Sequence, residues 1–209
     1  MLRALEQRGI HRSDLFRQDG KGPNRTSGNK AKKMRMCLTR AYDYKTPDGK
    51  FIRHNTLRFA PPPEGEVHHP DCLGDHFNSR RKDKDFLQAR PDENGGYIYG
   101  LDSVQTIIYN LPQVVRASLR GEIVVWVEGE KDADNGKKRL KLITTTCPQG
   151  AKHWKPYYAS FLTGAHVVVV ADNDGAGCEH AEMVAEELLP FAGSVKVLEL
   201  PSLPEKGDL

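Results

Sequence analysis

The chain has 209 residues, of which 38% are hydrophobic and 28% charged, a composition typical of a folded globular protein. These values exclude wholesale disorder and a fibrous repeat. The longest apolar run, around residues 167–171, is far shorter than the roughly 20 residues that a membrane span needs. The first residues, MLRALEQRGI, do not form an apolar signal segment. We therefore expect a cytoplasmic protein that makes no contact with a membrane.

The net charge of +3 conceals a strong asymmetry along the chain. Residues 1–90 carry 20 Lys and Arg against 11 Asp and Glu, a net charge of +9, whereas residues 91–209 carry 11 against 17, a net charge of −6. A basic half favours binding to a polyanion, and an acidic half with clustered carboxylates favours divalent cations. The alternative is two ordinary solvated surfaces.

The first segment, residues 1–35, is rich in Gly, Asn, Ser, Lys and Arg after a short helical start. It is expected to be a flexible basic arm. Residues 33–59 then form two short extended runs separated by Thr-Pro-Asp-Gly at positions 46–49, which predicts a β-hairpin. A long loop is expected from residue 60 to about residue 81, followed by a strand at residues 84–90.

Next come an Asn-Gly-Gly turn and the extended run YIYG. Asp102 or Ser103 can cap a helix that continues through Tyr109, and Pro112 suits the first turn of a second helix that ends near Gly121. These elements predict an α+β first half with a basic antiparallel sheet.

From residue 122 the pattern changes to apolar strands that end in acidic residues. IVVWVEGEKDADNG and HVVVVADNDGAG both run from apolar to charged, as parallel strands covered on both faces do. The second run is followed by a helix with apolar residues at helical spacing, and then by a third strand, SVKVLELP. With a weaker candidate strand at residues 140–146, this alternation predicts an α/β unit with a mainly parallel sheet.

The four cysteines form no C-x-x-C pair, which excludes a zinc ribbon and a thioredoxin-like motif. Six residues that can bind zinc nevertheless fall between residues 68 and 76: His68, His69, Asp71, Cys72, Asp75 and His76. Because this segment follows three prolines and lacks the spacing of a tetrahedral site, we interpret it as a polar loop and expect no zinc.

Two acidic pairs stand where the apolar runs end, Glu128 with Glu130 and Asp172 with Asp174. In a parallel sheet, functional groups collect beyond the carboxyl ends of the strands. If the backbone stays extended, the two carboxylates of each pair point to the same side. Unpaired carboxylates in such a cluster repel one another unless a cation neutralises them, so the pattern predicts Mg²⁺ or Mn²⁺, with two ions expected. The alternative is a turn and a solvated loop.

Three motifs carry a resemblance to a known family: VEGEKDAD at residues 127–134, ADNDGAG at 171–177 and LPEKGD at 203–208. They resemble the Toprim domain that bacterial primases, topoisomerases and some nucleases share. Within that superfamily they are most similar to the Toprim domains of primases and primase-helicases from phages and mobile elements. TTTCPQGAKHW and KDFLQARPDENGGYIYGL are similar to flanking regions of such primases. The resemblance covers roughly residues 40–209 and implies a Rossmann-like Toprim fold.

The resemblance assigns roles to individual residues. It implies that Glu128, Asp172 and Asp174 are catalytic metal ligands, with Glu128 also able to act as a general acid or base. Asp208 is expected to be a further metal ligand. Glu130 and Lys131 vary more among relatives and are expected to support the ligands without binding the metal themselves.

Basic residues are expected to bind nucleic acid and nucleotide. Lys152 can contact a nucleotide phosphate, although a solvated loop lysine is the alternative. Arg58, Lys84 and Arg90 are expected to contact the phosphates of the template strand. Phe86 and Tyr97 can stack on bases, but aromatic side chains of this kind more often pack in a core.

The resulting hypothesis is a DNA primase catalytic core that uses nucleoside triphosphates on a single-stranded DNA template. Residues 1–35 are expected to form the arm, residues 36–120 a smaller basic α+β subdomain, and residues 121–209 the Toprim subdomain. The chain contains no P-loop motif, so a helicase, where one takes part, is expected to act from outside these residues. A Toprim nuclease and a non-catalytic DNA-binding or replication-assembly module remain the alternatives.

Overall fold

A computed structural model describes residues 33–150 and 153–199, which belong to one compact unit running from Lys33 to Leu209. The predicted basic arm, except for its last three residues, lies outside the described residues. The predicted boundaries at residues 35 and 120 therefore stay predictions. Within the described ranges, no helix has both the length and the apolar character needed to cross a bilayer.

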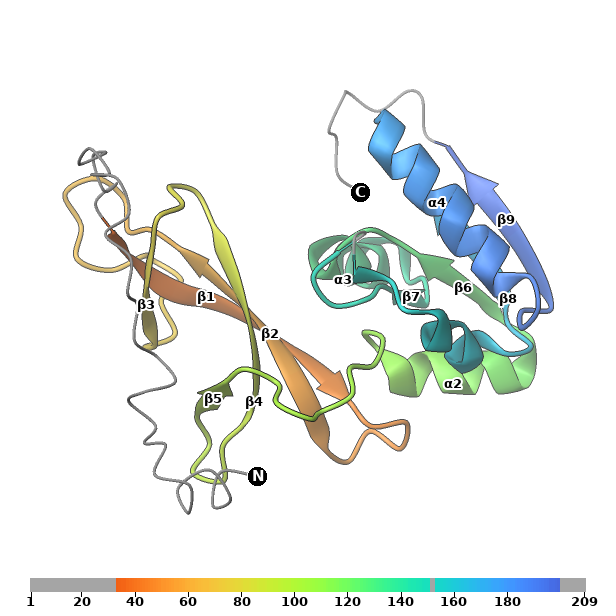
Figure 1. Ribbon diagram of the computed structural model, residues 1–209, viewed down its shortest axis with the longest axis horizontal. Coiled ribbons are helices and arrows are strands. Elements are labelled where there is room, and N and C mark those ends of the chain that lie inside the picture. The colour runs from red at the N-terminus through yellow and green to blue at the C-terminus, as the bar shows by residue number, and fades with distance from the viewer. Residues whose placement is uncertain (1–32, 151–152, 200–209) are drawn as a thin grey trace, which may run out of the picture. The chain divides into compact units, whose positions relative to one another are not determined.

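The first half of the described chain forms an antiparallel sheet of five strands in the order β3-β1-β2-β4-β5 (Figure 1). The strands are β1 (Met34–Lys45), β2 (Ile52–Ala60), β3 (His76–Ser79), β4 (Asp85–Pro91) and β5 (Tyr97–Tyr99). The hairpin expected at residues 33–59 and the strand expected at residues 84–90 are both present. The turn at residues 46–49 closes the hairpin through a hydrogen bond from the Gly49 N–H to the Thr46 carbonyl.

The two faces of this sheet differ in character. One face carries a small core of Met36, Leu38, Leu57, Phe59 and Ala89. The other face carries Arg40, Arg58 and Phe86, which the strand register places side by side, as Arg40 pairs with Arg58 and Arg58 with Phe86. Alternation of side chains separates the two faces, and an irregularity in β1 between Leu38 and Arg40 moves Arg40 to the face of Arg58.

Two expectations for this half were wrong. The segment 60–81, expected to be all loop, contains β3, which pairs with the start of β1. Residues 102–109, expected to form a helix, are not helical. Their backbone groups bind distant partners instead: the Tyr109 N–H donates to the Thr146 carbonyl, and the Ile107 N–H donates to Nε2 of the buried His54. These long-range hydrogen bonds take the place of helical hydrogen bonds at these two residues.

The second half forms a parallel sheet of four strands in the order β7-β6-β8-β9. Its strands are β6 (Ile123–Trp126), β7 (Thr144–Thr145), β8 (His166–Val170) and β9 (Ser194–Leu198), and all neighbours run parallel. The helices are α2 (Leu111–Arg120), α3 (Glu130–Leu140) and α4 (Gly175–Leu188), with a 3₁₀ helix η3 (Pro156–Leu162). The expected mainly parallel sheet is therefore confirmed, and the described chain is a mixed α/β structure.

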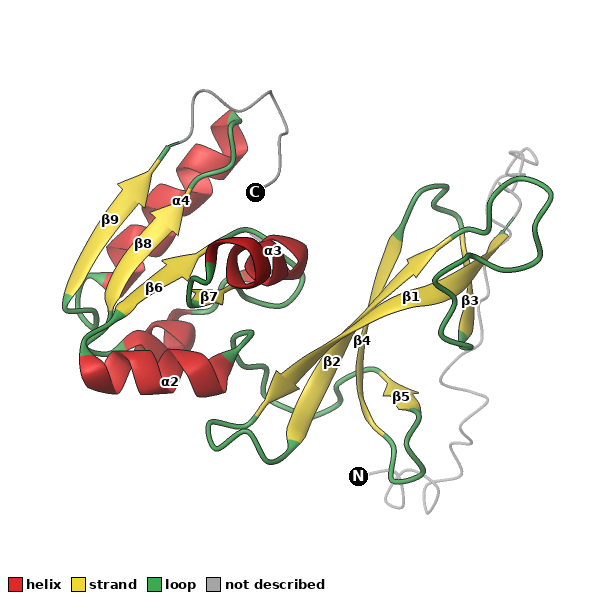
Figure 2. Cartoon of the chain, turned by 180° about the vertical axis from the view of Figure 1, so that it is seen from behind, coloured by secondary structure: helices red, strands yellow, loops and turns green. Residues whose placement is uncertain are grey.

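Helices cover both faces of the parallel sheet. The β6-α3-β7 and β8-α4-β9 connections leave the middle of the sheet in opposite directions, so right-handed crossovers place α3 and α4 on opposite faces. Figure 2 shows α3 in front of the sheet and α4 behind it. Pro112 lies in the first turn of α2, and Gly121, in the left-handed conformation, ends that helix as predicted.

Helix α3 was not expected, because the sequence after β6 reads as a charged turn. Its buried face consists of only Glu130, Ala133 and Gly136. A Cβ at Gly136 would lie 2.7 Å from the Thr144 side chain, so the helix packs directly on β7. A buried face made of a carboxylic acid, an alanine and a glycine gives no hydrophobic periodicity that a sequence pattern could reveal.

Candidate functional site

The candidate site lies beyond the carboxyl ends of β6 and β8. These strands are neighbours, with Trp126 paired to Val169, and their connections run to opposite edges of the sheet. This is the switch-point arrangement at which open α/β sheets leave a crevice for a ligand. Glu128 follows the end of β6 by two residues, and Asp172 follows the end of β8 by two residues. The two carboxyl groups therefore come to the same edge.

Glu128 and Asp172 contact each other through their side chains. A hydrogen bond to Asp172, partial burial and the negative charges of Asp172, Asp174 and Asp132 together raise the pKa of Glu128 to about 8. Two carboxylates this close cannot both ionise without strong repulsion, so one proton holds them together near neutral pH. A cation can take the place of that proton, so this pair fits a divalent metal.

Asp174 caps the start of α4 and also offers a carboxylate oxygen to a metal ion. Its Oδ1 accepts a hydrogen bond of 2.7 Å from the Gly177 N–H at the start of α4, and its own N–H donates to the Asp172 carbonyl at 2.7 Å. The backbone therefore turns between the two aspartates, and the extended geometry expected for this pair is wrong. The side chain remains exposed, and its second carboxylate oxygen is the one that can bind a cation.

Gly177 determines how closely α4 approaches the Asp172 loop. A Cβ at this buried position would lie 2.7 Å from both the Cβ and the carbonyl oxygen of Asp172. Only glycine fits there without a shift of the backbone. The glycine in the DNDGAG motif is thus required by packing at the site.

Glu130 does not lie beside Glu128, contrary to the expectation from their spacing. It is the first residue of α3, is only 6% exposed, and its Oε1 accepts a hydrogen bond of 2.8 Å from the Tyr44 hydroxyl of β1. Burial raises the pKa of this carboxyl group. Glu130 therefore joins α3 to the antiparallel sheet. Lys131, the next residue of α3, is exposed.

A second link between α3 and the antiparallel sheet was not predicted. Asp134 forms an ion pair with Arg40 of β1 and accepts a hydrogen bond of 3.1 Å from the Tyr109 hydroxyl. No sequence motif marks this contact, because its members are 94 and 25 residues apart. The basic face of the antiparallel sheet is thus the face that contacts α3.

The loop after β7 supports Glu128 from its backbone side. The Thr146 hydroxyl donates to the Glu128 carbonyl at 2.8 Å. Gln149 and Gly150 adopt left-handed conformations, and the Cys147 thiol donates to the Gly150 carbonyl. Lys152 of this loop and Asp208 lie outside the described residues, so their predicted roles stay predictions.

The predicted template-binding residues lie on or beside the antiparallel sheet. Arg58 of β2 is half-buried and donates to the Thr39 hydroxyl at 2.9 Å. Arg90 of β4 forms an ion pair with Asp102. Lys84 is exposed and immediately precedes β4. Phe86 lies on the same face as Arg58, whereas Tyr97 packs against the apolar cluster on the other face.

No family model matches the chain, and no curated protein matches it. Among solved structures, the chain is similar to the crystal structure of a DNA primase domain from Pseudomonas aeruginosa, with a TM-score of 0.48 and 14% sequence identity. The similarity covers 79% of this chain and 44% of that one, so the chain spans less than half the length of its match.

Proposed function

We propose that the chain is the catalytic core of a Toprim-type DNA primase, a metal-dependent nucleotidyltransferase that synthesises primers on single-stranded DNA. The observation that carries this proposal is the contact between Glu128 and Asp172 at the switch point of a parallel sheet. The resemblance of the surrounding motifs to Toprim sequences supports the choice of reaction.

The donor set fits hard divalent cations. Glu128, Asp172 and Asp174 offer carboxylate oxygens at one sheet edge, and Asp208 is included as a fourth ligand from the resemblance. Two Mg²⁺ or Mn²⁺ ions, when bound, would neutralise charge on the transferred phosphoryl group and activate the attacking hydroxyl.

In the proposed reaction the 3′-hydroxyl of the growing primer attacks the α-phosphate of a nucleoside triphosphate, and pyrophosphate leaves. Glu128, to which the resemblance assigns a metal-ligand or general acid/base role, is the carboxyl group proposed to accept the proton of that hydroxyl. The N-terminus of α4 begins at Gly175, beside the same edge, and its dipole favours the negative charge of the phosphates.

The basic face of the antiparallel sheet would bind the template. Arg40, Arg58 and Phe86 share this face by register, and Arg90 lies on it four residues beyond Phe86 on the same strand. Arginines bind phosphates without regard to sequence, as a primase template requires. The same face of the antiparallel sheet contacts α3, which begins two residues after Glu128. A template bound on this face would therefore lie beside α3.

The test is primer synthesis on single-stranded DNA with nucleoside triphosphates and Mg²⁺ or Mn²⁺. Asp172→Ala and Glu128→Gln should each reduce synthesis by about 100-fold or more, since a catalytic acid or base contributes that much. Glu187→Gln, an exposed carboxylate on α4, is the matched control and should keep full activity. Normal synthesis by Asp172→Ala would contradict the proposal.

Two other outcomes would redirect the assignment. Metal-dependent nicking of plasmid DNA without nucleotides would favour a Toprim nuclease that uses water as the nucleophile. DNA binding that a magnesium chelator does not change, without turnover on any nucleotide, would favour a non-catalytic module.

A further inference from the structure

Four side chains on the antiparallel sheet converge at a place that the proposed reaction does not use. Cys37 lies within β1 and is fully buried, and His76, the first residue of β3, is its direct cross-strand partner. His68 and Cys72 come from the loop between β2 and β3. Each of the four offers one nitrogen or sulfur atom, and all of these atoms lie within 4.8 Å of one another.

The spacing of these atoms matches a tetrahedral metal site. The His76 Nε2 lies 3.2 Å from the His68 Nδ1, and the Cys72 Sγ lies 3.6 Å from each of these two nitrogens. Zinc bonds of about 2.0–2.1 Å to nitrogen and 2.3 Å to sulfur imply tetrahedral edges of about 3.3 Å between two nitrogens and about 3.5 Å between nitrogen and sulfur. The observed separations agree with both edges.

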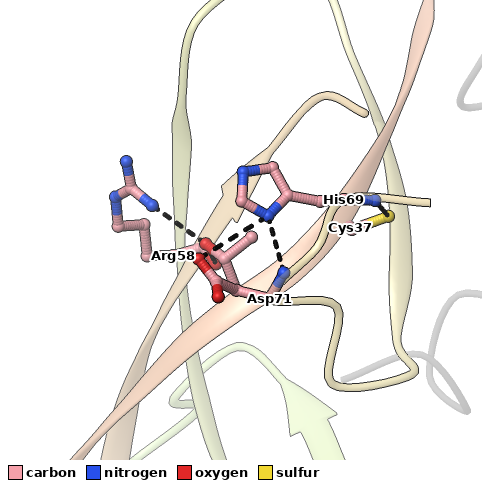
Figure 3. A network of polar contacts seen from close by, with 5 residues as sticks. Cys37, Arg58, His69 and Asp71 are labelled. Carbon is pink, nitrogen blue, oxygen red and sulfur yellow. Dashed lines mark hydrogen bonds and ion pairs between the residues drawn. The ribbon is translucent and has the colours of Figure 1, made fainter. Parts of the chain in front are cut away.

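The surrounding backbone holds the donors in this arrangement. The His69 N–H donates to the Cys37 Sγ at 3.3 Å, as Figure 3 shows, and such a bond would stabilise a thiolate ligand. The Leu73 N–H donates to the Leu38 carbonyl at 2.8 Å, and the Leu38 N–H donates to the Asp75 carbonyl at 2.9 Å. These two bonds dock the loop on β1 at Leu38, the residue next to Cys37.

Hydrophobic burial does not explain why the loop is docked there. Residues 61–75 contain no helix or strand, and irregular segments longer than about 12 residues are uncommon in compact domains. The large apolar side chains of this loop point to solvent, with Val67 68% exposed and Leu73 61% exposed. A metal ion would supply the cross-link that apolar packing does not.

We propose that Cys37, His68, Cys72 and His76 form a structural zinc site that fixes the loop and β3 to β1. Two thiolates and two imidazoles are the donors that zinc prefers over Mg²⁺, and four protein ligands leave no open position for substrate. The two thiolates balance the charge of Zn²⁺. This proposal replaces the expectation of no zinc and is independent of the proposed primase activity.

The sequence pattern could not reveal this site, because one ligand comes from far along the chain. The loop offers His68-x₃-Cys72-x₃-His76, which is three ligands. The fourth, Cys37, lies 31 residues before His68 and joins the others only through the pairing of β1 with β3.

The test is the zinc content of the full chain, produced in zinc-supplemented medium and measured by mass spectrometry of the metal after gel filtration. We expect about one zinc per chain. Cys72→Ser and His68→Ala should reduce this to a small fraction of one, whereas the matched controls Cys178→Ser and His69→Ala should keep it. Asp172→Ala should also keep its zinc, which separates this site from the proposed catalytic one.

Cobalt replacement gives a second readout that does not depend on the stability of the variants. The Co²⁺ form should show the thiolate charge-transfer and d–d absorption of a tetrahedral cysteine site, and Cys72→Ser should weaken the former. A folded wild-type chain without zinc, variants that keep their zinc, or a Cys37–Cys72 disulfide found by peptide mapping would each overturn the proposal.

Discussion

Replacing Glu128 by glutamine should stabilise the chain in magnesium-free solution, and the gain should grow as the pH rises. Glu128 has its ordinary pKa of 4.5 when unfolded and a pKa of about 8 in the folded chain. The folded state therefore keeps a proton that the unfolded state has lost. The resulting contribution to stability is complete below about pH 4.5 and is lost as the pH rises through 8. Glutamine stays uncharged at every pH in this range, so the variant does not lose this contribution to stability.

The size of the effect follows from the pKa difference and the exposure of the site. Each pKa unit corresponds to about 1.4 kcal/mol, which sets a ceiling of nearly 5 kcal/mol for the whole difference. Glu128 is only half-buried, so screening by solvent reduces this ceiling, and we expect about 1–2 kcal/mol between pH 6 and pH 9.

The assay is urea unfolding of wild type and Glu128→Gln at both pH values, without a chelator so that bound zinc is retained. Glu187→Gln should track the wild type at both pH values. Added Mg²⁺ should stabilise the folded chain because it binds only the folded site. The effect at pH 9 should be larger for the wild type than for Glu128→Gln, because the variant lacks one of the proposed carboxylate ligands. An equal change in the stability of wild type and Glu128→Gln between pH 6 and pH 9 would contradict this expectation.

Three further substitutions test the packing and the charge of the site. Gly177→Ala should cost about 1–3 kcal/mol of unfolding free energy, because its Cβ would lie 2.7 Å from Asp172, and primer synthesis should fall with it. Tyr44→Phe should cost about 1–3 kcal/mol in urea unfolding, since it removes the Tyr44 hydroxyl that donates to the buried Glu130. Arg58→Ala should weaken single-stranded DNA binding and lower the slope of log K against log salt by about 0.7, as expected for the loss of one phosphate contact.

Each of these substitutions has a matched control. Gly175→Ala places a Cβ where nothing lies within 4 Å, so its effect on stability should be smaller than that of Gly177→Ala. Tyr99→Phe alters an exposed tyrosine and should leave stability unchanged. Arg116→Ala removes an exposed arginine of α2 and should leave the salt slope unchanged. Equal effects within any of these pairs would refute the corresponding explanation.

The position of Glu128 and Asp172 could be predicted from sequence because it depends on a local pattern and a general rule. Each residue follows an apolar run, and the carboxyl ends of parallel strands meet at one edge of a sheet. The β1–β2 hairpin and α2 were predictable for the same reason, as their turn residues and caps lie next to them in the chain.

The remaining features depend on contacts that local patterns do not encode. Glu130 was expected beside Glu128 because an extended backbone was assumed, but α3 begins at that residue and turns the side chain toward Tyr44. Residues 102–109 carry a plausible helix cap, yet their backbone binds Thr146 and His54. In both cases a distant partner overrides the local preference.

These distant contacts explain how the antiparallel sheet takes part in the candidate site. Glu128 lies between β6 and α3, and α3 is held by Tyr44 and Arg40 of β1 through Glu130 and Asp134. The Tyr44 ring also packs in the same core as the parallel strands. The Glu128 backbone is therefore fixed from one side by the parallel sheet and from the other by a helix anchored to the antiparallel sheet. The segment that carries Glu128 is therefore held by contacts with both halves of the described chain.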